Sequence, residues 1–276
     1  MRWKYILKKA GLIIGVLLGV GFSLIPFLCF VSSAFKIQTE VTAIPPQWWP
    51  SFSLDFFRSA IVRYGILRYL VNSVIVAGST TLITIFLGTL AGYSLARLPR
   101  QWARVFLIVI LACAMFPQIA IAGPIWRFLQ FMGWLNTYQG LVFPYVALTL
   151  PLAVWILTLF FREIPEDLES AALVDGCTRP GALMRVVLPL SAPGLFTASI
   201  LCFIYAWNEF FIALLVMTDP ARQTMPVGIA LFQGEHTIPW GEIAAASFIT
   251  TAPLVIMVLF FQRRIITGLS AGAIKG

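Results

Sequence analysis

Residues 169–190 read ESAALVDGCTRPGALMRVVLPL and form the one long polar segment in the second half of a very apolar chain. Hydrophobic residues make up 60% of the 276 residues, 11% are charged, and the mean hydropathy is +0.92. Soluble domains carry about 25% charged residues and are about half apolar. The composition therefore predicts an all-α, polytopic integral membrane protein in which this polar segment joins two spans.

Six apolar segments are long enough to cross a membrane, which takes about 20 residues in a helix. They predict one transmembrane domain over residues 1–276. The first segment follows a basic N-terminus, as in a cleaved signal peptide, but it exceeds the ~7–15 apolar residues of such a peptide, so we expect a retained anchor. Pro117 lies inside the third segment and is expected to kink it. The segments are 11–34, 70–96, 105–122, 138–161, 194–217 and 243–261.

The distribution of basic residues predicts the orientation of these spans. Thirteen of the 19 Lys and Arg residues fall on the side that holds both termini, the loop 162–193 and the tail 262–276. Loops rich in Lys and Arg stay in the cytoplasm, so this side is predicted to be cytoplasmic. The thirteen are Arg2, Lys4, Lys8, Lys9, Arg97, Arg100, Arg104, Arg162, Arg179, Arg185, Arg263, Arg264 and Lys275.

The sequence lacks the residues that several classes of function require. The net charge of +8 is interpreted as an orientation signal rather than as a nucleic-acid surface. The four cysteines have no paired spacing, and a single histidine cannot form a metal cluster, so we expect no bound metal. One histidine also provides little for general acid–base catalysis, so we expect no catalytic residue. No P-loop is present, so any energy from ATP must come from another polypeptide, and no cofactor is expected on this chain.

The polar segment has the signals of two short helices joined by a tight turn. Acidic residues follow Pro165, as suits the first turn of a helix, and Gly176 is a natural residue to end it. Thr178 can cap a second helix that ends before Leu188 and Pro189. Leu168, Ala171, Ala172 and Asp175 fall on one face of the first helix, and the two alanines make part of that face small.

This first helix could lie on the membrane surface or insert into a partner protein. A helix lying on the membrane usually has basic residues on one face and bulky apolar residues on the other. Here the helix opens with acids, which the anionic inner leaflet repels, and its alanines allow close approach of another backbone. The pattern favours insertion into a cleft of a partner protein.

The segment resembles the loop motif of ABC-importer permeases, E-A-A, three residues, G, nine residues, I, one residue, L-P. Ala171, Ala172 and Gly176 match its first half, and Leu188 and Pro189 end it at the same spacing. The motif glutamate falls on Ser170, with Glu169 one place earlier, and its isoleucine is Val186. A salt bridge from the motif position is therefore not expected, and the sequence leaves open whether Glu169 takes that role.

Further segments resemble the smaller permease subunit of maltose-type carbohydrate importers: NSVIVA (72–77), AGYSLARL (91–98), FREIPEDLE (161–169), AWNEFFIALL (206–215) and QRRIITGLSAGAIKG (262–276). The resemblance implies the type I ABC importer permease fold, a place in the inner cell membrane, and transport of a sugar or a related polyol or glycoside by alternating access. It also implies three kinds of partner: a second permease, a homodimeric cytoplasmic ATPase that holds ATP and Mg²⁺, and an outer solute-binding protein.

By the same resemblance, two segments would contact the ATPase. In the loop these are Glu169, Ser170, Ala171, Ala172, Asp175, Gly176, Val186, Leu188 and Pro189, and in the tail Gly268, Gly272, Lys275 and Gly276.

An ion-coupled secondary transporter is the main alternative. Such transporters need ionisable groups within their spans, and Glu209 is the clear candidate. With Trp207, which could stack on a sugar, and Asn208, which could donate a hydrogen bond to it, Glu209 marks a candidate substrate path. Packing and a structural role are the competing interpretations.

Overall fold

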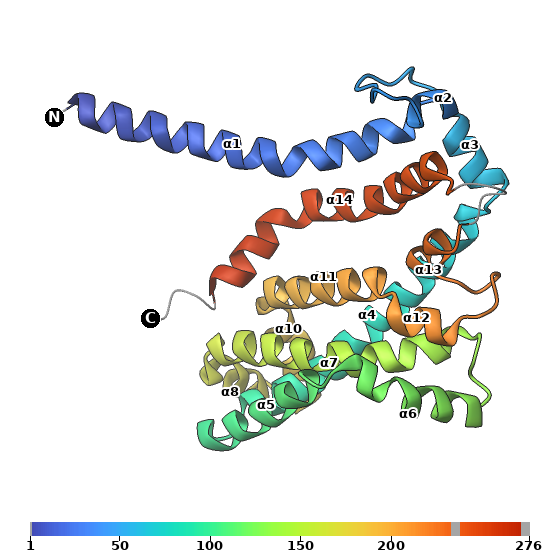
Figure 1. Ribbon diagram of the computed structural model, residues 1–276. Helices are drawn as coiled ribbons and strands as arrows, with labels where there is room; N and C mark the ends of the chain where they lie inside the picture. Colours follow the sequence, from blue (N-terminus) through green and yellow to red (C-terminus); the bar gives the residue numbers. More distant parts are fainter. Residues whose placement is uncertain (1, 233–237, 272–276) are drawn as a thin grey trace. The chain divides into compact units, whose positions relative to one another are not determined.

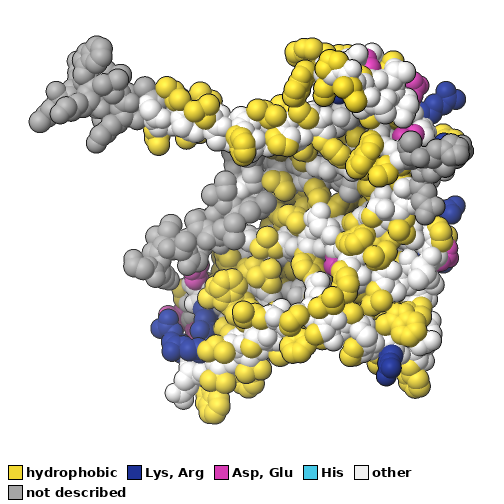
Figure 2. All heavy atoms as spheres, viewed as in Figure 1, with side chains coloured by type: hydrophobic (Ala, Val, Ile, Leu, Met, Phe, Trp, Pro, Cys, Tyr) yellow, Lys and Arg dark blue, Asp and Glu magenta, His cyan; other side chains and the backbone are white. Residues whose placement is uncertain are grey.

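The computed structural model describes residues 2–232 and 238–271, and these contain helices and connecting segments but no strand. The chain divides into two compact units. Met1–Leu67 and Ile229–Pro253 form the first unit, and Arg68–Gly228 and Leu254–Gly276 form the second. Hydrophobic side chains cover much of the face shown in Figure 2, as expected of a surface that meets lipid.

The first unit contains α1 (Arg2–Ala34), α2 (Gln38–Val41), α3 (Asp55–Val62) and the start of α14 (Trp240–Ala271). None of the most apolar window of Gly11–Ala34 is buried within the chain. The core of this unit joins α3 to α14, where Phe56 packs with Ala244 and Ala245. The Ser59 hydroxyl donates a hydrogen bond to Glu242 Oε1 at 3.2 Å, which fixes the same pair of helices.

The second unit is built around α7 (Tyr138–Glu163), which contacts α5 (Arg100–Ala114) and α11 (Ala192–Asn208) (Figure 1). Two thirds of the most apolar window of α7 is buried. α4 (Ile66–Ala96) also packs on α7, because Gly92 has no side chain to hold Leu157 away: a Cβ there would lie 3.1 Å from the Leu157 Cβ. The hydroxyls of Thr84 and Thr149 meet at 2.8 Å between the same helices.

Four of the predicted segments coincide with single helices that are long and apolar enough to cross a membrane. These helices are Gly11–Ala34, Ile66–Ala96, Tyr138–Glu163 and Trp240–Gln262. Two bent helix pairs also qualify when each pair counts as one span. The described chain therefore has four to six candidate spans.

The third and fifth predicted segments are not single straight helices. In the third, α5 ends at Ala114 and α6 (Gln118–Phe131) begins after Pro117, at 83° to α5. Pro117 disfavours helical backbone in the residue before it, and this explains the break. The fifth segment is divided between α11, which ends at Asn208, and α12 (Phe211–Val216).

Candidate functional site

The polar segment folds into two helical arms, which we call the elbow (residues 166–190). α8 (Glu166–Val174) forms the first arm, with the three predicted acids in its first turn. α9 (Arg179–Ala182), a π-helix (Leu183–Val187) and α10 (Leu188–Leu190) form the second. The predicted helix–turn–helix arrangement is present.

The turn of the elbow is fixed by backbone hydrogen bonds. Gly176 has φ of 87°, a left-handed conformation that favours glycine. Its N–H donates to Leu173 O at 3.1 Å, and the Cys177 N–H donates to Ala172 O at 2.9 Å, which together complete a Schellman motif. The Thr178 hydroxyl then accepts a hydrogen bond from the Gly181 N–H at 3.3 Å and caps α9.

The second arm runs further than expected, because it does not end before Pro189. A π-turn precedes the proline, and in it the Leu188 N–H donates to Leu183 O, five residues back. In an α-helix the proline ring would meet the carbonyl of Arg185, and the wider π-turn relieves that clash. Leu183 and Val187 are buried in the same hydrophobic cluster as Phe161 of α7.

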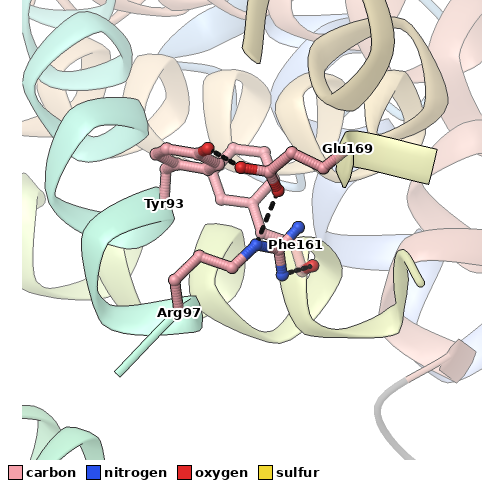
Figure 3. A network of polar contacts seen from close by, with 4 residues as sticks. All are labelled: Tyr93, Arg97, Phe161 and Glu169. Atoms are coloured by element: carbon pink, nitrogen blue, oxygen red, sulfur yellow. Dashed lines mark hydrogen bonds and ion pairs between the residues drawn. The ribbon is translucent and has the colours of Figure 1, made fainter. Parts of the chain in front are cut away.

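Glu169 fastens α8 to the end of α4, and Arg97 extends this network to the end of α7 (Figure 3). Its Oε1 accepts a hydrogen bond from the Tyr93 hydroxyl, and its Oε2 accepts one from Arg97 Nε at 2.8 Å. Arg97 Nη1 also donates to Phe161 O at 3.1 Å. The side chains of Arg97 and Glu169 are 19% and 11% exposed, so this ion pair is largely shielded from water. Glu169 thus takes a bracing role, which the sequence left open.

The two sides of α8 differ from the face that the sequence predicted. Ala172 is 8% exposed and lies with Glu169 on the side buried against the chain itself. Ala171 and Asp175 are exposed, as is Val174 at 87%. The predicted face is therefore divided: Ala172 is covered by its own chain, whereas Ala171 and Asp175 are exposed.

The other loop residues predicted to contact the ATPase also differ in exposure. Ser170 and Pro189 are exposed, and Val186 and Leu188 are half-buried. Sequence reasoning missed the anchoring positions Leu183 and Val187, although their spacing of four residues places them on one side of a helix.

In the candidate substrate path at the end of α11, Trp207 and Glu209 are buried and contact other residues of the chain itself. Trp207 is 1% exposed and stacks on Phe203 with ring centroids 5.4 Å apart. Glu209 is buried, accepts a hydrogen bond from the Tyr145 hydroxyl at 2.6 Å, and accepts two from the backbone N–H groups that begin α12. Asn208 is exposed, with its amide bonded to Ile204 O at 2.8 Å. Of the three, only Asn208 presents a side chain at the surface.

The predicted ATPase-contacting tail lies at the edge of the described residues. Gly268 falls within α14, which continues to Ala271. Gly272, Lys275 and Gly276 lie outside the described residues. Over residues 2–232 and 238–271, no three histidine, cysteine or acidic side chains gather in a way that could hold a metal ion.

Comparison with known proteins decides the family. Residues 84–270, more than half of the chain, match the family of binding-protein-dependent transport system inner membrane components. The chain belongs to this family. The permease is 44% identical, over 98% of both chains, to the trehalose/maltose transport system permease protein MalG of Thermococcus litoralis.

One further relative agrees with this assignment, and one solved structure shares the fold. The sulfoquinovosyl glycerol transport system permease protein SmoH of Agrobacterium fabrum is 41% identical to the permease over 92% of this chain and 89% of its own. A chain of a bacterial ABC transporter that imports alginate shares the fold, with a TM-score of 0.77 at 19% identity over 93% of this chain and 96% of that one.

These findings confirm the resemblance seen in the sequence. The permease is the membrane component of a binding-protein-dependent ABC importer, and it is a transport subunit rather than an enzyme. It therefore works with a solute-binding protein. The ion-coupled alternative finds no support in the comparisons.

Proposed function

We propose that the permease couples to a separate homodimeric ATPase through the elbow and moves a sugar, or a related glycoside or polyol, into the cell. A second permease subunit would form the other half of the path. ATP and Mg²⁺ would be held by the ATPase. The cargo class is supported by the relatives, whose names carry trehalose, maltose and sulfoquinovosyl glycerol.

The observation that carries the coupling is the bracing of α8. Movement of α8 can be transmitted to the transmembrane helices only if α8 is fixed to them. Glu169 provides this link, because it joins α8 to Arg97 near the end of α4. The opposite side of α8 leaves Ala171 and Val174 uncovered. When the ATPase closes on ATP, movement of the elbow would tilt α4 and α7 and open the path outward, and hydrolysis would reverse it.

The proposed orientation places both termini and the elbow in the cytoplasm. It is supported by the excess of Lys and Arg on that side. An elbow labelled only from outside the cell by a membrane-impermeant thiol reagent would refute both the orientation and the coupling.

Cysteine cross-linking to the ATPase tests the coupling directly. Ala171→Cys places a thiol on the exposed side of α8, and Ala172→Cys, one residue away, places it on the buried side. We expect the first variant to cross-link to a co-expressed ATPase and the second to react much less. Equal reaction at the two positions, or none at Ala171→Cys with an intact complex, would contradict the proposed contact surface.

Reconstitution in liposomes tests whether transport by this chain requires the ATPase and the other subunits. The chain alone in liposomes should take up no sugar, and uptake should require ATP, the ATPase, the second permease and the binding protein together. Sugar uptake by this chain alone under an ion gradient would refute the proposal.

A further inference from the structure

A cleft of about 290 Å³ lies between α5 and α7, apart from the elbow and from the end of α11. Three arginines line it together with one tryptophan and three aliphatic side chains. They are Arg100, Arg104, Leu107, Ile108, Leu111, Trp155 and Arg162.

The polar and apolar residues of the cleft are separated along the helices. On α5, Arg100 and Arg104 come first and Ile108 and Leu111 follow at helical spacing, so this stripe of side chains is cationic at one end and apolar at the other, about 16 Å away. On α7, Arg162 lies in the last turn, with Trp155 two turns earlier. Each of the two helices therefore contributes arginine at one end of the cleft and apolar side chains further along it.

The cationic end of the cleft has no acidic partner among residues 2–232 and 238–271. Among the described residues, none of the three cleft arginines forms an ion pair. Arg162 Nη2 donates to Leu95 O at 3.3 Å, which positions that side chain and leaves its remaining N–H groups available. Guanidinium groups bind phosphate oxygens through paired N–H donors, so the three arginines are suited to an anionic phosphate group.

We propose that this cleft binds an anionic phospholipid, with the phosphate among Arg100, Arg104 and Arg162 and one acyl chain along Ile108 and Leu111. A soluble phosphate would satisfy the arginines but would leave the apolar stripe without a ligand. Basic pockets between membrane helices on the cytoplasmic side are suited to anionic lipid head groups. The proposal does not depend on the elbow, and the proposed orientation enters only in the choice of the inner leaflet.

Native mass spectrometry of the tagged full-length chain in mild detergent tests this proposal, with dioleoyl phosphatidylglycerol and dioleoyl phosphatidylcholine offered in equal amounts. We expect the wild type to retain phosphatidylglycerol selectively. The double variant Arg100→Gln/Arg104→Gln should lower that retention about 30-fold, since each basic residue near an anionic lipid contributes about 1 kcal/mol. Arg58→Gln/Arg127→Gln, which removes the same charge at two exposed positions outside the cleft, should change it little.

Two more measurements separate the possible occupants. Arg100→Lys/Arg104→Lys keeps both charges at the positions changed in the double glutamine variant and should retain more lipid than it, which separates loss of charge from loss of the arginine side chains. Millimolar inorganic phosphate should displace little lipid. Equal retention of both lipids, an equal loss in the control variant, full displacement by phosphate, or loss of the lipid once the chain is assembled with its partner subunits would each overturn the proposal.

Discussion

Replacing Glu169 with glutamine removes the charge that holds Arg97 but leaves an amide oxygen able to accept the Tyr93 hydroxyl. A hydrogen bond to a charged group stabilises a protein by about 1.5–3 kcal/mol. Because Arg97 is 19% exposed and keeps its bond to Phe161 O, we expect a loss near the lower end, about 2 kcal/mol. The docked population of α8 relative to the undocked one should fall about 30-fold.

Hydrogen–deuterium exchange measures this directly. Amide protons of residues 166–174 should exchange about 30-fold faster in Glu169→Gln, while those in the middle of α7 should not change. Glu166→Gln is the matched control, because it removes the same charge from an exposed position of the same helix. Adding Arg97→Gln should make α8 no less protected than in the single variant, since it removes the uncompensated guanidinium. Unchanged exchange in Glu169→Gln, or the same rise in Glu166→Gln, would refute the bracing role.

Three other substitutions have defined outcomes. Gly176→Ala should strain the turn by about 1–2 kcal/mol, because φ is 87° there, and should reduce stimulation of the ATPase in an assembled importer while membrane insertion stays normal; unchanged stimulation would contradict this. Glu209→Ala should destabilise the permease by about 3 kcal/mol, seen as a lower thermal midpoint in detergent, because it leaves three buried donors unpaired, whereas Asn208→Ala should leave the midpoint unchanged. Gly92→Leu should force α4 from α7 and lower the yield of monodisperse protein, but Gly78→Leu should not, since nothing lies within 4 Å of a Cβ at that position; equal yields would argue against this packing.

The sequence was sufficient for the features that depend on local chemistry. Apolar length alone located four helices, and a glycine followed two residues later by a threonine predicted the turn of the elbow. These features could be predicted because the free energies that determine them come from lipid burial and from backbone geometry within a few residues. The bend after α5 was harder. Pro117 indicated a kink, but the composition of residues 105–122 does not distinguish a kinked span from two helices at 83°.

Features that depend on distant contacts could not be predicted in this way. Arg97 and Glu169 are separated by 72 residues, and only the folded chain brings them together. The same holds for Ala172, whose small side chain suits either a partner cleft or the chain's own surface. Spacing within α8 showed that Ala171 and Ala172 lie near each other, but the packing of α8 decides which of them is covered.

The bend of the elbow relies on one glycine with positive φ and one threonine cap, and the residues that face outward from α8 contribute to neither. Under the proposed coupling, the shape of the elbow and its contact with the ATPase are therefore encoded by different positions. Substitutions at Ala171 and Val174 could then adapt the proposed contact to a different ATPase one at a time, while Gly176 and Thr178 keep the bend of the elbow unchanged.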